Sequence, residues 1–119
     1  MLKAQNEYTD QFIDLTQSEK TNFDFLNEMD YVIVVAAISS PDKCEKQSEL
    51  CYIINVQGTS FVINEALKRK CKVIFFSSDA VYGEDIGIPF SESTPVKPIS
   101  NYGKMKNSVE IAFCGDEYF

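Results

Sequence analysis

The sequence predicts an α/β fold with a mostly parallel sheet. Two apolar runs, Tyr31 to Ala37 and Val73 to Ser78, favour strands covered on both faces, because parallel strands carry near-continuous apolar and β-branched residues. Between them, from Ser39 or Ser40 to Lys70, apolar residues recur at three- and four-residue intervals, which indicates an amphipathic helical region.

The segment before the first apolar run is predicted to contain a strand and a helix. Gln11 to Leu15 favours a short strand that ends in a polar turn. Thr16 or Ser18 can cap a short helix that extends through Met29. Residues 1–8 are polar and weakly patterned, so we expect a frayed start or the remnant of an upstream element.

The last third is predicted to contain a loop and a helix. Pro89, Pro95 and Pro98 exclude a helix from the loop, because proline lacks the backbone donor that a helix interior needs. A helix then extends from Tyr102 to Phe113, and Gly115 can close it.

Length and composition limit the function classes. A chain of 119 residues has room for one modest domain. The net charge of −7 disfavours nucleic-acid binding, because Lys68-Arg69-Lys70 is the only basic cluster. No apolar run approaches the ~20 residues of a membrane span. With no signal-peptide pattern at the N-terminus, a cytoplasmic protein is expected.

Side-chain chemistry narrows the site further. The sequence has no histidine, which excludes Ser-His and Cys-His catalysis and histidine metal sites. The cysteines lack CxxC spacing, so no metal site is expected and all are predicted to be buried or half-buried reduced thiols: Cys44, Cys51, Cys71 and Cys114.

One juxtaposition suggests proton-transfer chemistry. Tyr102 and Lys106 are four residues apart, so they share one face of a helix. A serine hydroxyl at the end of the second strand, from Ser77 or Ser78, is expected to meet them. A nearby ammonium favours the phenolate and lowers the tyrosine pKa, so Tyr102 can exchange a proton with a substrate oxygen near neutral pH.

Several residue groups together resemble the extended short-chain dehydrogenases/reductases, the NAD-dependent sugar-nucleotide epimerases, dehydratases and reductases. The resemblance spans nearly the whole chain, in the family's order and spacing. The groups that carry it are Asp14-Leu15, Asp30 to Ala37, Asn55 to Thr59, Ser77 to Gly83, Pro89, Glu92, Pro95, Pro98, and Tyr102 to Lys106.

The resemblance implies a partial Rossmann-like three-layer fold, with residues 1–119 as the single middle portion of such a domain. It implies NAD or NADP as cofactor and a nucleotide sugar as substrate. The residues it assigns to catalysis are Ser78, Tyr102 and Lys106. The residues it assigns to cofactor binding are Asp14, Leu15, Ala36, Ala37, Asn55, Tyr102 and Lys106.

Several of these residues also have plain structural interpretations. Asp14 fits a turn or cap as well as an adenine contact. The small Ala36 and Ala37 fit helix packing as well as close approach of a ligand. Asn55 and Gly58 are poor helix formers, so they indicate either a kink or, by the resemblance, a cofactor-side amide and a close helix contact.

Two parts of the family fold are missing from the sequence. The chain has no GxxGxxG turn, which would hold the pyrophosphate, and no C-terminal substrate lobe. Without the first βαβ unit, the strand Tyr31 to Ala37 has an open apolar edge. Either the strand near Phe12 pairs with it, or a second copy or complementing chain fills the gap, or the chain is part of a longer protein.

Residues after Ser78 separate the reactions within the family. Ala80 replaces the carboxylate base that a dehydratase needs, so dehydration is disfavoured. Ser78-Asp79 followed by Val81 resembles the dTDP-4-dehydrorhamnose reductases, although these have tyrosine at the position of Ala80. Tyr82 and Gly83 also suit the 4-epimerases. We therefore expect a nucleotide-sugar keto reductase in the complete protein, with the isolated chain inactive. The alternatives are a 4-epimerase and a non-enzymatic truncated or split product that needs a partner chain.

Overall fold

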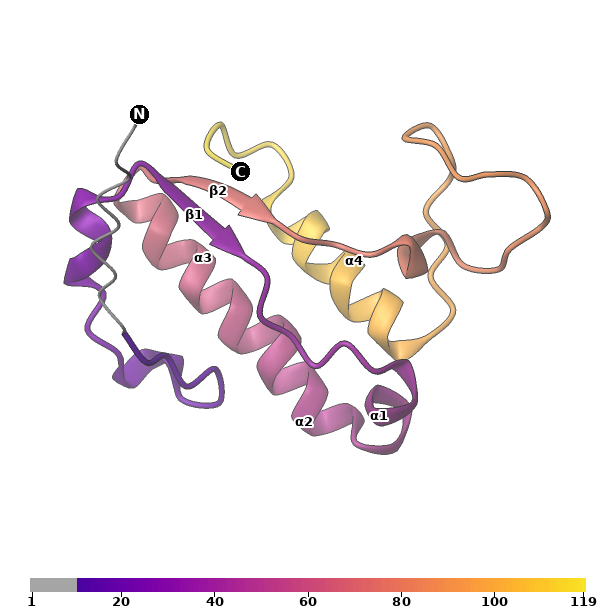
Figure 1. Cartoon of the computed structure of the whole chain (residues 1–119), viewed down its shortest axis with the longest axis horizontal. Coiled ribbons are helices and arrows are strands. Elements are labelled where there is room, and N and C mark those ends of the chain that lie inside the picture. Colours follow the sequence, from indigo (N-terminus) through magenta and orange to yellow (C-terminus); the bar gives the residue numbers. More distant parts are fainter. Residues whose placement is uncertain (1–10) are drawn as a thin grey trace, which may run out of the picture.

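The computed structural model describes residues 11–119, so the expectation for residues 1–8 lies outside it. Strands β1 (Tyr31–Val34) and β2 (Lys72–Phe75) pair in parallel, with Tyr31 opposite Lys72 and Val34 opposite Phe75 (Figure 1). The predicted α/β class with a parallel sheet is thus confirmed. Both strands are shorter than predicted, because the pairing of the two segments ends with the hydrogen bond from Phe76 N to Val34 O.

The connection between the strands is helical but not continuous. Ser40 caps it as predicted, accepting a hydrogen bond from Lys43 N at 3.2 Å with Pro41 in the first turn. The helix breaks at Gln47 (φ −129°, ψ 50°). The segments are α1 (Pro41–Lys46), α2 (Ser48–Tyr52), the π-helix η3 (Ile53–Gly58) and α3 (Thr59–Lys68).

The predicted strand from Gln11 to Leu15 is wrong. Asp14 instead forms a turn: its carboxylate accepts from Thr16 N at 2.9 Å and from Thr16 Oγ1 at 2.7 Å. The predicted helix through Met29 is two 3-10 helices, η1 (Ser18–Lys20) and η2 (Asp24–Glu28). Neither has a side-chain cap, so the predicted capping by Thr16 or Ser18 is wrong.

Helices cover one face of the sheet in the described residues. Figure 1 shows α3 and α4 (Asn101–Phe113) beside the two strands, and both helices contribute to one core. The core residues are Phe23, Leu26, Val34, Val62, Ile63, Ala66, Cys71, Val73, Val109 and Phe113.

The opposite face of the sheet is exposed, which corrects the prediction of strands covered on both faces. Its large apolar side chains are Tyr31, Ile33, Val35, Ile74 and Phe76. Within residues 11–119, β1 has β2 as its only hydrogen-bonded neighbour, and Gln11 to Leu15 does not fill its other edge. The second helical layer of the expected three-layer fold is therefore not among the described residues.

The cysteine prediction holds for three of the four thiols. Cys44, Cys51 and Cys71 are fully buried, but Cys114 is exposed, because it follows the last turn of α4 and faces outward. Within residues 11–119, no helix combines the length and the apolar character that crossing a membrane requires.

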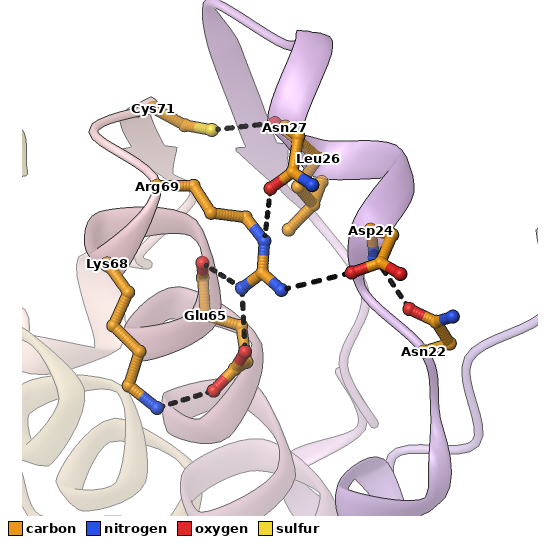
Figure 2. Close-up of polar contacts among 8 residues, drawn as sticks. All are labelled: Asn22, Asp24, Leu26, Asn27, Glu65, Lys68, Arg69 and Cys71. Carbon is orange, nitrogen blue, oxygen red and sulfur yellow. Dashed lines mark hydrogen bonds and ion pairs between the residues drawn. The ribbon is translucent and has the colours of Figure 1, made fainter.

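A polar cluster joins the end of α3 to η2 (Figure 2). Arg69 Nη1 lies 2.7 Å from Glu65 Oε2, and Arg69 Nε donates to Asn27 Oδ1 at 2.9 Å. Lys68 Nζ is 2.6 Å from the other oxygen of Glu65. Hydrogen bonds from Lys68 and Arg69 hold the pKa of Glu65 below its ordinary value. These four residues, which we call the Arg69 cluster, therefore favour the ionised form of the Glu65 carboxylate in the folded state.

We expect the Arg69 cluster to make stability sensitive to acid. Because the folded-state pKa of Glu65 is lowered, its contribution is complete above the unfolded value of about 4.3 and is lost as pH falls through the folded value. Glu65→Gln should lower the free energy of unfolding by about 0.5 kcal/mol at neutral pH and abolish that acid-dependent part. Urea unfolding across pH measures this, with exposed Glu19→Gln as control. Equal acid sensitivity in both variants would contradict it.

Candidate functional site

The hydroxyl, phenol and ammonium groups predicted for catalysis lie close together at the end of β2. Ser78 caps the 3-10 helix η4 (Asp79–Tyr82) and accepts a hydrogen bond from Ala80 N at 3.2 Å. Helix α4, which lies alongside the segment after β2 in Figure 1, brings Tyr102 and Lys106 to this segment. Both side chains are buried, at 8% and 3% exposure.

Contacts on both sides of Tyr102 fix the first turn of α4. The Glu45 carboxylate of α1 accepts hydrogen bonds from Asn101 N at 2.7 Å and from Asn101 Nδ2 at 2.9 Å. A Cβ atom at Gly103 would lie 2.4 Å from the carbonyl oxygen of Ala80, so only glycine allows this approach. Tyr102 thus sits between a residue tied to α1 and a residue packed on η4.

The Lys106 ammonium is turned toward the main chain that follows β2. Its Nζ donates to the Phe76 carbonyl oxygen at 2.6 Å and lies 4.6 Å from the centre of the Phe75 ring. It is 5.9 Å from the centre of the Tyr102 ring. Burial lowers the pKa of Lys106, and the negative charge of Glu110 opposes that change.

Burial also decides the protonation of Tyr102. It raises the pKa of the phenol above its ordinary value, and hydrogen bonding with the Ser78 side chain offsets part of that rise. Cys44 and Asp79 raise the pKa further. The predicted lowering of the Tyr102 pKa is therefore wrong for this structure, because desolvation of the phenol outweighs the groups that favour the phenolate.

Asn55 positions the chain that follows β1. Its Oδ1 accepts from Ile38 N at 2.8 Å, and its Nδ2 donates to Ile38 O at 3.0 Å. Asn55 is 2% exposed, so both ends of its amide are used inside the protein. In this structure the Asn55 amide thus fixes the backbone at Ile38, next to Ala36 and Ala37, and its contact with a cofactor stays a prediction.

The other predicted cofactor residues lie in two places. Leu15 and Ala36 line one apolar hollow of about 310 Å³ beside β1, whereas Asp14 faces a separate surface depression. The hydrogen bonds from Thr16 to the Asp14 carboxylate confirm the predicted turn at this residue. They also lower the pKa of Asp14. The structure therefore brings Ser78, Tyr102 and Lys106 together, but it does not bring Asp14 to them.

Two carboxylates at this site were missed by the sequence analysis. Glu110 follows Lys106 by four residues, so the helical spacing of Tyr102, Lys106 and Glu110 was a signal that went unused. Glu110 also accepts a hydrogen bond from the Ser77 hydroxyl. Glu45 is 56 positions from Asn101, and no local pattern connects the two residues.

Comparison with known proteins identifies the family of this chain. The sequence model of the NAD dependent epimerase/dehydratase family matches residues 3–113. A UDP-glucose 4-epimerase from Halalkalibacterium halodurans is 38% identical over 95 residues, which cover 77% of this chain and 28% of that protein. The chain thus spans less than a third of the length of this relative.

Solved structures show the same fold. The structure of a dTDP-4-dehydrorhamnose reductase from Clostridium acetobutylicum matches 73% of this chain and 32% of its own, with a TM-score of 0.66 and 35% identity. That of UDP-glucose 4-epimerase from Thermotoga maritima, solved with UDP-glucose, matches 75% and 30%, with a TM-score of 0.64 and 30% identity. The fold is therefore Rossmann-like, and the chain belongs to the NAD-dependent epimerase/dehydratase family.

Proposed function

We propose that this chain supplies the catalytic face of an enzyme that reduces a keto group on a nucleotide-bound sugar with NAD(P)H. The observation that carries the proposal is the convergence of Ser78, Tyr102 and Lys106 at the end of β2. In parallel α/β folds, ligands bind at the carboxyl ends of the strands, which is where these groups lie.

The proposed chemistry follows from the protonation of the site. NAD(P)H, when bound, supplies a hydride to the carbonyl carbon. Ser78 hydrogen-bonds the carbonyl oxygen, and Tyr102 gives its proton to the alkoxide that forms there, so one hydride and one proton convert the ketone to an alcohol. A phenol whose pKa is raised stays protonated at neutral pH, which suits a proton donor. Lys106 provides positive charge beside the tyrosinate that remains.

Part of the structure fits the cofactor. Lys106 offers a buried ammonium to the ribose of the nicotinamide, and Ala36 and Ala37 present small side chains at the end of β1. Leu15 and Asp14 would contact the adenine end of the cofactor. Asn55 would hold Ile38 and the loop beside Ala36 and Ala37. The sequence has no glycine-rich turn for the pyrophosphate, so another segment must supply that contact.

A 4-epimerase is the second candidate. It is favoured by the 38% identity to a UDP-glucose 4-epimerase and by the Tyr82-Gly83 pair after Ser78. Epimerisation begins with removal of a proton from the sugar hydroxyl, so Tyr102 would have to start as the phenolate. The raised Tyr102 pKa disfavours that first step in the free protein.

A non-enzymatic product that needs a complementing chain is the third candidate. It is favoured by the missing glycine-rich turn and by the exposed apolar face of the sheet. Such a chain would bind neither NADH nor NADPH when purified alone.

The test is to isolate the native polypeptide that carries the Tyr102 peptide, weigh it by intact mass spectrometry and assay it with NAD(P)H and nucleotide sugars. We expect a mass well above the 13.5 kDa of this chain and consumption of NAD(P)H with a dTDP-linked 4-keto sugar. Conversion of UDP-glucose to UDP-galactose without net NAD(P)H consumption would favour the epimerase. A 13.5 kDa product that binds no dinucleotide would contradict both enzyme assignments.

A further inference from the structure

We propose that Glu110 is a positioning residue for Lys106. Its carboxylate anchors the Phe76–Ser77 segment that receives the Lys106 ammonium, and it lies one helical turn from Lys106 on α4. The inference rests on the proposed function, in which Lys106 acts as a cation beside the reacting groups.

Lys106 and Glu110 hydrogen-bond to consecutive residues of the segment after β2. The carbonyl of Phe76 accepts from Lys106 Nζ at 2.6 Å, and the next residue, Ser77, donates its hydroxyl hydrogen bond to Glu110. Lys106 and Glu110 are one helical turn apart on α4. Residues on two successive turns of α4 therefore form hydrogen bonds with Phe76 and Ser77, in the segment that leads into Ser78.

Lys106 is almost completely shielded from water. The side chain is 3% exposed, so water solvates its charge poorly. The groups that face it are the Phe76 carbonyl, the rings of Phe75 and Tyr102, and Glu110. Glu110 is the one carboxylate among the described residues that favours the charged form of Lys106.

Three polar side chains of α4 lie in a regular order along the helix. Tyr102, Lys106 and Glu110 follow one another at four-residue intervals and face Ser78, Phe76 and Ser77. The phenol and ammonium belong to the proposed reaction, whereas Glu110 touches neither Ser78 nor Tyr102 in these contacts. Its effect on the reaction therefore acts through Lys106 and Ser77.

The test separates the charge of Glu110 from its hydrogen bond. Glu110→Gln keeps an oxygen that can accept from the Ser77 hydroxyl but removes the negative charge. We expect the pKa of Lys106, followed in the full chain by NMR of ¹³Cε-labelled lysine, to fall below the wild-type value in this variant. Exposed Glu49→Gln on α2 is the matched control and should leave the Lys106 titration unchanged.

An unchanged or raised Lys106 pKa in Glu110→Gln would overturn the inference. The titration needs no substrate or cofactor, so its outcome is independent of whether the native polypeptide reduces a nucleotide sugar.

Discussion

Tyr102→Phe is expected to lower the turnover of the native polypeptide by about 10²- to 10⁴-fold, the contribution usual for a positioned general acid. The substitution removes only the hydroxyl that would protonate the alkoxide. The ring is 8% exposed, and a phenylalanine fills the same space, so the fold and NAD(P)H affinity should change little. Steady-state rates and NADPH fluorescence titration measure the two quantities separately.

The matched control is Tyr82→Phe. Tyr82 lies in the turn after Ser78 and stacks on Phe90 at a ring-centroid distance of 5.0 Å, so the variant removes a hydroxyl from the same region but not from the reacting groups. It should retain most of the activity. A Tyr102→Phe enzyme with wild-type turnover would remove Tyr102 from the mechanism, and loss of NADPH binding in that variant would assign it to the cofactor pocket instead.

Gly58→Ala is expected to lower the free energy of unfolding by about 2 kcal/mol or more. Gly58 has helical dihedral angles (φ −63°, ψ −44°), so helix propensity alone would make alanine better by about 1 kcal/mol. However, a Cβ atom there would lie 2.0 Å from the carbonyl oxygen of Leu15, which is backbone and cannot rotate away. The steric cost therefore exceeds the gain in propensity.

Chemical denaturation checks this expectation, with Gln57→Ala as the control. Gln57 is exposed on the preceding position of the π-helix, so the control changes helix propensity without a new contact and should leave stability nearly unchanged. A Gly58→Ala chain as stable as the wild type would show that the Leu15 segment does not rest on this helix in solution.

Local patterns predicted the elements that local forces determine. Caps and periodicity are encoded within a few residues. They predicted a helix start at Ser39 or Ser40, the helix from Tyr102 to Phe113 and the parallel pairing of the two apolar runs. The strand from Gln11 to Leu15 was wrong because a strand exists only beside a partner. No pattern within that segment shows whether a partner is present.

The proximity of Ser78, Tyr102 and Lys106 was predicted, but the electrostatics of these groups were not. The spacing of Tyr102 and Lys106 placed both side chains on one face of α4, and the end of β2 placed Ser78 near them. Sequence distance does not show how deeply each group is buried or where the ammonium is directed. Burial reversed the predicted direction of the Tyr102 pKa, and the Phe76 carbonyl determined the place of Lys106.

The exposed face of the sheet makes the stability of the fold depend on the molecules that bind there. Any molecule that covers Ile33, Val35, Ile74 and Phe76 in the native state, but does not bind the unfolded chain, raises apparent stability in proportion to the logarithm of its concentration. Apolar area at that face contributes to the heat-capacity change of unfolding only if a bound molecule covers it in the native state, because only then does unfolding expose it to water. The melting temperature of this chain is therefore a property of the chain and of its surroundings together.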